Sequence, residues 1–316
     1  MRPVTFFAVN KYLQSSGYSC YSFEVRTQGN YLPVDAEWNY KDIPHLNHIH
    51  NLVDSGVTFA DDHVVTSIIT QNVPPFFKFP MTLVNYHVAS DKIIYHSQFL
   101  FWVIVIETTF CFLDEINKAG CEVVTKYNLY GPRYLQWLCF FFKFVIKRNN
   151  KELMNEDVPM RNRRQELREA GFDFKVSMGE YHSYSKTLEL DRQNVISPNL
   201  MGFVGKFDLK DIPEGDEGLL LGDSVGMGFR VVRSVKKDVL LIFSRVCDHY
   251  GADLSSARCQ KGFLICPWHG KFVKPLATIS TKGDDVSVLQ KQAGVKLKVV
   301  GQAVSLYWEM KSEKRG

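Results

Sequence analysis

The amino-acid sequence predicts an α+β protein in which an antiparallel sheet and a long helix precede a second, all-β region. Three observations predict this fold class. Runs rich in β-branched and aromatic residues, separated by turn residues, fill 57–130. Apolar residues then recur with a helical period over 134–171. From 198 onward, short strand-like runs alternate with glycine and aspartate turns.

Length and composition allow two domains with separate cores. The chain of 316 residues is long for one compact domain, and we place the domains at 1–175 and 198–316 with a linker at 176–197. The 38 basic and 34 acidic residues are too evenly balanced for a nucleic-acid-binding protein. Seven cysteines are too few for a secreted disulfide scaffold, and the first residues lack a signal-peptide core, so we expect a reducing, cytoplasmic location.

The first elements along the chain are a short helix and several strands. The strand-like run VDAEWNY precedes DIPHLNHIHNLV, whose spacing predicts a helix or helical turn that begins near Asp42. Four β-type runs follow, separated by Asp, Asn, Pro, Lys and Gly, and together they predict a meandering antiparallel sheet. They are 57–73, 81–99, 101–113 and 121–130.

Two runs, 99–113 and 134–147, look membrane-like but lack the composition of a spanning helix. Glu107 interrupts the first, and Lys143 lies within the second, which has only fourteen residues where a spanning helix needs about 20. We expect both runs to be buried elements. For the second, which is strongly aromatic, an interfacial contact with a membrane is the alternative.

A long helix is predicted from Tyr134 onward. Pro159 is expected to break or restart it, with Asp157 placed to cap the second piece, and Gly171 is expected to end it. The apolar face of its first turns comprises Leu135, Leu138, Cys139, Phe142, Val145 and Ile146.

Two Cys/His pairs form the strongest motif in the chain. In CDHYGADLSSARCQKGFLICPWHG, Cys247-x-His249 is followed after sixteen residues by Cys266-x-x-His269. Zinc could use two thiolates and two imidazoles, but zinc-finger signatures usually group Cys with Cys and His with His. A two-iron cluster, with the cysteines on one iron and the histidines on the other, fits the pairing better. Cys259 departs from this spacing and is expected to be a strand or turn residue.

This stretch resembles the Rieske two-iron, two-sulfur domain of ring-hydroxylating and related oxygenases. The resemblance covers about residues 198–310 and includes Gly251, Leu254 and the sequence PWHG. It implies a [2Fe-2S] cluster with a reduction potential of roughly −150 to +300 mV, because imidazole replaces thiolate on one iron. The glycines permit tight loops whose backbone N–H groups can point at the cluster sulfurs.

The first domain resembles the helix-grip catalytic domain of Rieske oxygenases. In that fold, a curved sheet wraps the last helix and leaves an apolar cavity, and a D/E-x-x-H-x-x-x-x-H segment supplies two ligands of a mononuclear iron. Asp42-x-x-His45-x-x-x-x-His50 matches this segment without a gap. The resemblance implies that His45 and His50 bind Fe(II). It also implies that Asp42 hydrogen-bonds a ligand histidine and bridges to a Rieske histidine, usually across a subunit boundary. On spacing alone, the same residues could be an ordinary helix start.

By the same resemblance, the third iron ligand is a carboxylate of the long helix. We choose Asp157, with Glu156 and Glu152 as alternatives, although Asp157 is also the natural cap before Pro159. One helix cannot present His48 together with both other histidines, so we expect His48 to support a ligand or to be exposed. Structural roles are expected for the remaining histidines, which are His63, His87, His96 and His182. Several aromatic residues could line an apolar pocket or belong to the core: Phe76, Phe77, Phe79, Trp102 and Phe140 to Phe142.

Together these resemblances imply a Rieske-type oxygenase component that uses electrons from a separate ferredoxin or reductase. It would activate O2 at the mononuclear iron and hydroxylate, demethylate or desaturate an apolar small molecule.

No G-x-G-x-x-G that opens a helix is present, so no flavin or nicotinamide site is expected. The alternative is a Rieske electron-transfer protein fused to an iron-free domain that binds a hydrophobic ligand, and a zinc-stabilised binding module is a third reading. The familiar oxygenase subunits have the opposite domain order, and a homotrimer is an expectation from the resemblance alone.

Overall fold

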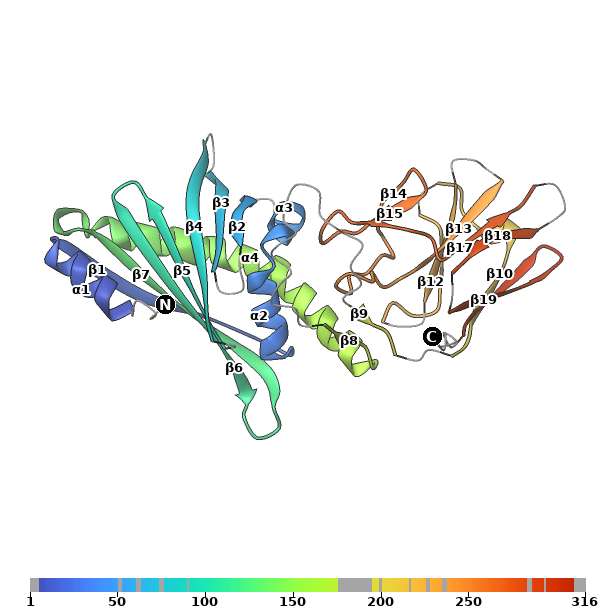
Figure 1. The fold of residues 1–316 in the computed structure, drawn as a ribbon, viewed down its shortest axis with the longest axis horizontal. Helices are drawn as coiled ribbons and strands as arrows, with labels where there is room; N and C mark the ends of the chain where they lie inside the picture. The colour runs from blue at the N-terminus through green and yellow to red at the C-terminus, as the bar shows by residue number, and fades with distance from the viewer. Residues whose placement is uncertain are drawn as a thin grey trace. The chain divides into compact units, whose positions relative to one another are not determined.

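The structure is a computed structural model, drawn in Figure 1. It describes residues 6–50, 53–60, 64–73, 77–89, 91–175, 195–198, 201–215, 217–225, 228–234, 238–282, 286–292 and 294–309. The chain forms two compact units, and the first division between them falls inside the longest helix, between Gln165 and Glu166. Among the described residues, no helix is long and apolar enough to cross a membrane.

The first unit is built on a seven-stranded antiparallel sheet with the order β1-β7-β6-β5-β4-β3-β2. Strands β2 to β7 form the predicted meander, and β1 closes the order by pairing with β7. Glu107, which interrupts the apolar run of β6, accepts hydrogen bonds from Lys92 at 3.0 Å and from Asn128 at 3.2 Å. The strands are β1 (Tyr18–Gly29), β2 (Val53–Ala60), β3 (Val64–Val73), β4 (Phe77–Ala89), β5 (Lys92–Phe99), β6 (Trp102–Asp114) and β7 (Ala119–Pro132).

Helices of the first unit lie before, between and after these strands (Figure 1). Helix α1 (Phe6–Ser15) precedes β1, and α2 (Pro33–Lys41) follows it. Helix α2 contains the run VDAEWNY, so the expectation of a strand there is wrong; Pro33 at its first position favours a helix start. The short turns η1 (Ile43–His45) and α3 (Leu46–Ile49) lead toward β2. After β7, η2 (Arg133–Leu135) precedes the long helix α4 (Leu138–Glu169).

Helix α4 continues through Pro159, which corrects the expectation of two helical pieces. Proline lacks the N–H that would donate to the carbonyl of Asn155. The neighbouring side chains of Met154 and Met160 are buried, so this part of the helix is packed on both sides of the proline in the sequence. Asp157 is therefore an interior residue of the helix and not a cap.

Gly171 ends α4, as predicted. Its φ of +86° is in the left-handed region that glycine adopts without strain. Its N–H donates to the carbonyl of Arg168 at 2.9 Å, and the N–H of Phe172 donates to the carbonyl of Leu167 at 2.9 Å. These two bonds form a Schellman cap, and Leu167 and Phe172 add the hydrophobic contact that accompanies it.

The first turns of α4 have one packed face and one exposed face. The packed face comprises Leu135, Leu138, Cys139, Phe142 and Ile146, which contact Phe23, Trp102, Tyr127 and Leu129 of the sheet. The other face carries the exposed residues Trp137, Phe140, Phe141 and Phe144. The expectation of a wholly buried element is therefore wrong for 134–147. The helix packs on a single sheet, and no second layer among the described residues covers its outer side.

The second unit is all-β apart from the last residues of α4 and the short turn η4 (Leu209–Asp211). Two of its sheets meet in one buried apolar cluster that includes Phe229, Leu240, Val304 and Leu306. These sheets are β11-β12-β13-β17-β18 and β10-β20-β19. A small sheet, β14-β15-β16, and the pair β8-β9 complete the unit.

The strand bounds in the second unit are β8 (Asp173–Phe174), β9 (Val195–Ile196), β10 (Gly202–Asp208), β11 (Leu219–Leu221), β12 (Phe229–Arg233), β13 (Val239–Ser244), β14 (Cys259–Gln260), β15 (Phe263–Ile265), β16 (Phe272–Val273), β17 (Ala277–Ser280), β18 (Ser287–Lys291), β19 (Val295–Val300) and β20 (Ala303–Trp308). The predicted fold class is confirmed: a first unit of antiparallel sheet and long helix, and an all-β second unit. His63, His182, Phe76 and most of the expected linker lie outside the described residues, as do the side chains of Phe77 and Phe79.

Candidate cluster and metal sites

Two loops of the second unit carry the Cys/His pairs, and both loops have the same hydrogen-bond pattern. In the loop after β13, the N–H of Cys247 donates to the carbonyl of Ala252, and the N–H of Gly251 donates to the carbonyl of Cys247, each at 2.9 Å. In the loop after β15, the N–H of Cys266 donates to Lys271 at 2.8 Å, and that of Gly270 donates to Cys266 at 2.9 Å. Each turn therefore begins at a cysteine and closes at a glycine four residues later.

Both glycines have left-handed backbone conformations, with φ of +90° at Gly251 and +65° at Gly270. A side chain would be strained at either position. At Gly251, a β-carbon would also come within 2.6 Å of the side chain of Leu167. The glycines predicted from the motif thus have a structural role, which is to turn the chain back sharply behind each Cys/His pair.

The four predicted cluster ligands are buried together at these loops. The side chains of Cys247 and Cys266 hydrogen-bond each other, and the rings of His249 and His269 have centroids 5.0 Å apart. The two thiols share one hydrogen bond, which raises the pKa of Cys247 well above its ordinary value and, together with His269, lowers the pKa of Cys266 well below it. A thiolate is the form of cysteine that binds metal. The donor set and its burial therefore fit a [2Fe-2S] cluster.

Several residues that the sequence did not single out hold these loops. Lys271 donates to Asp248 at 2.8 Å, which ties the second loop to the first. The buried guanidinium of Arg230 donates to the carbonyls of Leu254 at 2.7 Å and Ala257 at 2.5 Å. Cys259, by contrast, lies on β14 opposite Leu264 and is a strand residue, as expected.

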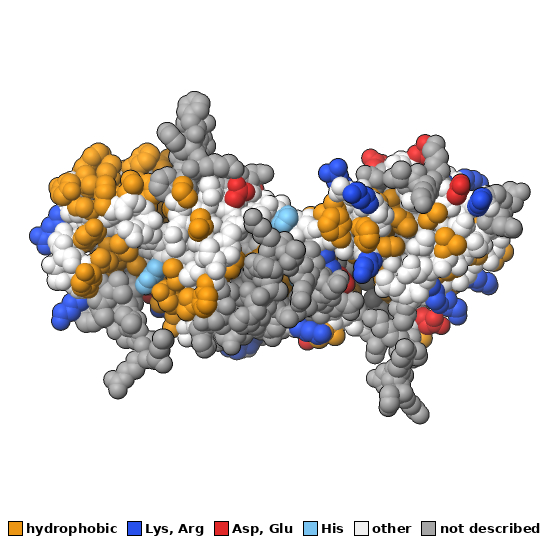
Figure 2. Space-filling model, turned by 45° about the horizontal axis from the view of Figure 1, so that its top comes forward, with side chains coloured by type: hydrophobic (Ala, Val, Ile, Leu, Met, Phe, Trp, Pro, Cys, Tyr) orange, Lys and Arg blue, Asp and Glu red, His pale blue; other side chains and the backbone are white. Residues whose placement is uncertain are grey.

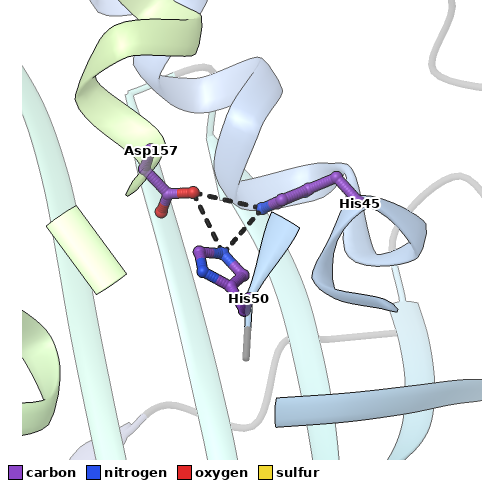
Figure 3. A group of neighbouring side chains, drawn as sticks. All are labelled: His45, His50 and Asp157. Atoms are coloured by element: carbon purple, nitrogen blue, oxygen red, sulfur yellow. Dashed lines mark hydrogen bonds and ion pairs between the residues drawn. The ribbon is translucent and has the colours of Figure 1, made fainter. Parts of the chain in front are cut away.

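In the first unit, three side chains converge in the arrangement shown in Figure 3. His45 comes from the end of η1, His50 from the residue after α3, and Asp157 from the interior of α4. The Nε2 atoms of His45 and His50 are 3.2 Å apart. Oδ1 of Asp157 lies 3.2 Å from Nε2 of His45 and 3.1 Å from Nε2 of His50. All three residues are buried, and they form the candidate metal-binding group in the part of the chain that the structure describes.

The short helix α3 is what allows two histidines five residues apart to meet. In a continuous helix, residues five apart differ by about 140° around the axis and do not share a face. Here the helix ends at Ile49, and His50 has extended backbone angles of φ −91° and ψ 126°. Asn47 links this segment to β2 by two hydrogen bonds. Its side-chain oxygen accepts the N–H of Ser55 at 2.5 Å, and its side-chain NH2 donates to the carbonyl of Ser55 at 2.8 Å.

Both histidines are held so that Nε2 faces the centre of the group. The Nδ1–H of His45 donates to the backbone carbonyl of Asp42, and the Nδ1–H of His50 donates to Glu156 at 2.5 Å. With the proton on Nδ1, each neutral ring presents an Nε2 lone pair. Two such lone pairs and a carboxylate oxygen within 3.2 Å of one another repel unless a metal cation or a shared proton lies among them.

The spacing of the donors also suits a metal ion. Ligand atoms at right angles, each about 2.1 Å from a cation, are about 3.0 Å apart. The observed separations of 3.1 and 3.2 Å are close to that value. Two imidazoles and one carboxylate on one side of a cation form the facial arrangement typical of non-haem Fe(II). The residues of this site therefore fit a mononuclear iron.

A buried polar network stabilises the charge of Asp157. Asn39 donates to Oδ1 at 3.3 Å, and Nη2 of Arg161 lies 3.5 Å from Oδ2. Arg161 is itself buried, donates to Oδ1 of Asn39 at 2.8 and 2.7 Å, and donates to the hydroxyl of Tyr31 at 3.2 Å. Burial raises the pKa of Asp157, but without a metal ion a proton on Nε2 of His45 or His50 can hydrogen-bond the carboxylate, and these contacts together with Arg161 hold the pKa well below its ordinary value.

The remaining predicted site residues occupy supporting positions. Glu156 contacts Nδ1 of His50 and not the centre of the group, and Glu152 is exposed. His48 is also exposed. Asp42 contacts His45 mainly through its backbone carbonyl, and its carboxylate Oδ2 is 3.8 Å from Nδ1 of His45 and 2% exposed. Asn39 and Arg161 were missed, because an asparagine and an arginine 122 positions apart carry no local pattern.

Solved structures similar to this chain resemble it weakly. The di-domain ARO/CYC protein BexL from the BE-7585A biosynthetic pathway is 8% identical, with a TM-score of 0.40 over 44% of this chain and 49% of BexL. The match thus spans about half of BexL. TTHA0849 from Thermus thermophilus is 12% identical, with a TM-score of 0.37 over 44% of this chain and 95% of that protein. Nothing about activity follows from likenesses this low, and no curated protein sequence matches the chain.

A family comparison bears on the second unit. Residues 207–275 match the family described as the Rieske [2Fe-2S] domain. The matched range contains both Cys/His loops, the small sheet β14-β15-β16 and the strands β12 and β13 that precede the first loop. The match agrees with the buried set of two cysteines and two histidines at equivalent loops. Residues 207–275 of this chain are therefore a Rieske [2Fe-2S] domain, and this domain implies a [2Fe-2S] cluster.

Proposed function

We propose that this protein is the oxygenase component of a Rieske-type system. A separate ferredoxin or reductase would supply electrons, and an apolar small molecule would be hydroxylated, demethylated or desaturated. When bound, the cluster supplies one-electron transfer and a mononuclear iron supplies dioxygen activation. The observation that carries the proposal is the convergence of His45, His50 and Asp157 within 3.2 Å of one another, in a chain that also contains a Rieske domain.

The protein's own residues would prepare the mononuclear site before any metal binds. The carbonyl of Asp42 and the carboxylate of Glu156 hold the Nδ1 protons, so that both Nε2 atoms face inward. Asn39 and Arg161 keep Asp157 ionised and direct Oδ1 toward the histidines. We further propose that Asp42 has the bridging role toward a Rieske histidine that the family resemblance implies.

Iron content tests this proposal most directly. A [2Fe-2S] cluster plus one mononuclear site requires three irons per chain, whereas a cluster alone gives two. We expect three in the purified protein, together with an EPR signal of mononuclear Fe(II) after addition of nitric oxide. His45→Ala and His50→Ala are expected to lose one iron and this signal while keeping the visible spectrum of the cluster.

His48→Ala is the matched control, because His48 is an exposed histidine of the same segment. It is expected to keep all three irons and the nitric oxide signal. Two irons in the unmodified protein, or loss of the cluster spectrum in the His45 and His50 variants, would contradict the two-site proposal.

One observation favours the alternative, in which the first unit binds a hydrophobic ligand without iron. Asp157 already has a buried counter-charge in Arg161, so a proton shared among the three side chains could replace a metal. A groove of about 400 Å³ also lies between β1 and α4; its lining includes the apolar Val25, Met154 and Val158, although six of its ten residues are polar or charged. In this case the iron content stays at two, and binding of an apolar ligand does not depend on His45 or His50.

A further inference from the structure

The start of α4 presents an exposed aromatic face that the proposed chemistry does not use. Phe140, Phe141 and Phe144 lie along one side of α4, and Trp137, in the turn just before the helix, continues this side at the spacing i, i+3, i+4, i+7. Their exposed fractions are 71%, 76%, 60% and 66%. We call these four residues the aromatic face. Figure 2 shows hydrophobic side chains gathered at the end of the first unit where α4 begins.

The aromatic face is continuous with the turn between β5 and β6. Phe141 contacts Phe142, whose ring packs edge-on against Trp102 with centroids 5.2 Å apart. Trp102 in turn contacts Phe101, and Phe101 and Leu100 are both exposed. The exposed apolar residues of the two segments are therefore joined beneath the surface by the packed pair Phe142 and Trp102.

Basic side chains lie next to the aromatic face in the sequence. Residues 133–151 contain five basic side chains and no acidic one. Lys147 and Arg148 come three and four positions after Phe144, so they occupy the next turn of the same side of α4 and are exposed. Lys143 lies beside Phe144 and extends over the rings of Tyr21 and Phe23, with Nζ 5.9 and 6.0 Å from their centroids.

We infer that the aromatic face inserts into the interface of an anionic lipid bilayer, with the helix lying on the membrane and not across it. Trp and Phe favour the membrane interface, and a helix with an aromatic side bordered by Lys and Arg is typical of interfacial binding. Anionic headgroups attract the basic side chains. A second copy of the chain is a poorer occupant, because pairing two such faces would bring ten positive charges together.

Vesicle binding of the full-length protein with its metals in place tests this inference. We expect sedimentation with vesicles of phosphatidylcholine and phosphatidylserine, and much weaker sedimentation with phosphatidylcholine alone. Of the five tryptophans, Trp137 is exposed, Trp38 and Trp308 are half-buried, and Trp102 and Trp268 are buried. Lipids brominated in the acyl chains are therefore expected to quench mainly the fluorescence of Trp137. Trp137→Phe should remove most of this quenching while leaving vesicle binding nearly unchanged.

Two pairs of substitutions separate the apolar and the electrostatic contributions. Phe140→Ser with Phe144→Ser is expected to weaken binding at least about tenfold through loss of buried apolar area. Lys147→Gln with Arg148→Gln is expected to weaken binding to anionic vesicles about 10- to 30-fold. Phe59→Ser with Phe203→Ser is the matched control, since both phenylalanines are exposed and lie on β2 and β10, away from α4 in the sequence.

Three outcomes would overturn the inference. The first is equal sedimentation of the unmodified protein and the Phe140/Phe144 variant. The second is equal binding to vesicles with and without phosphatidylserine. The third is a self-associated protein that dissociates in the Phe140/Phe144 variant and does not bind vesicles, which would assign the aromatic face to contact between copies. None of these measurements depends on the mononuclear iron. Their outcome therefore tests membrane binding independently of the proposed oxygenase function.

Discussion

Glu156 and Asp157 are adjacent on α4, yet they face different atoms of the same histidine. Oδ1 of Asp157 lies 3.1 Å from Nε2 of His50, whereas Glu156 accepts a hydrogen bond from Nδ1 at 2.5 Å. Successive residues of a helix are about 100° apart, so the two carboxylates approach the ring from different sides. This geometry favours Asp157 as the third ligand and gives Glu156 the role of orienting His50.

Substitution of the two carboxylates distinguishes these roles. Asp157→Asn is expected to lower the iron content from three to two per chain, because a neutral amide is a poor ligand and leaves Arg161 without its counter-charge. Glu156→Gln is expected to keep the site but weaken Fe(II) binding about 10- to 100-fold. Competition with a chelator measures both affinities. An equal loss of Fe(II) affinity in the two variants would contradict the different roles given to Asp157 and Glu156.

A half-buried histidine away from the site, His96, predicts a pH dependence of stability. His96 lies on β5, its ring contacts Tyr86, and burial lowers its pKa from the ordinary value. The unfolded chain then binds more protons than the folded chain, so this contribution is complete above the unfolded pKa of about 6.5 and is lost as the pH falls below it. We expect the urea midpoint of unfolding to fall between about pH 7 and pH 5.

His96→Gln is expected to make that decrease shallower, since glutamine does not titrate in this range. His48→Gln, which removes an exposed histidine, serves as the comparison. Parallel pH profiles for the unmodified protein and His96→Gln would show that His96 does not contribute.

At the scale of elements, a single helix, α4, contributes side chains to the core under the sheet, to the candidate metal site and to a cluster of the second unit. The first turns of α4 pack on β6 and β7, its middle presents Asp157 and Arg161, and its last residues pack in a cluster with Phe172, Phe174 and Val246. Pro159 lies close to the centre of this helix and costs it a hydrogen bond. Tertiary packing therefore decides that α4 remains one helix.

Pro159→Ala tests that account. Alanine restores the N–H donor toward Asn155 and has the highest helix propensity, so the free energy of unfolding is expected to rise by about 1–3 kcal/mol. Lys151→Ala, an exposed change on the same helix, is expected to stay within about 0.5 kcal/mol. Chemical denaturation of the three proteins gives the comparison. A lower stability of Pro159→Ala would mean that contacts of the proline ring outweigh the missing hydrogen bond.

At the scale of the whole molecule, the candidate metal site and the Rieske ligands belong to different compact units. The three side chains of the candidate metal site all precede Gln165, and the four proposed cluster ligands all follow Glu166. Each group is held by contacts within its own unit, including Asn39 and Arg161 in one and Arg230 and Lys271 in the other. The two sites should therefore load independently.

Cys247→Ser tests this independence. Loss of a thiolate ligand is expected to abolish the visible absorption of the cluster and to lower the unfolding temperature of the second unit, because cluster binding stabilises the folded form. The first unit is expected to retain its single iron and the nitric oxide signal. Loss of that iron together with the cluster would show that the sites are coupled.

The amino-acid sequence by itself identified the proposed Rieske ligands. Cys247, His249, Cys266 and His269 could be named because each pair lies on one short loop, where local spacing decides geometry. The order of sheet, helix and second β region was also predicted, because the period of apolar residues reports secondary structure directly. For the same reason, the packed side of α4 was predicted almost completely.

Only the tertiary structure decided the rest of the candidate site. The early end of α3 at Ile49 turns His50 toward His45, and packing carries α4 through Pro159 so that Asp157 faces both histidines and does not cap a helix. Tertiary packing also left the aromatic side of α4 exposed. These outcomes depend on contacts between residues more than one hundred positions apart, such as Arg161 with Asn39, and a local pattern of residues does not record such contacts.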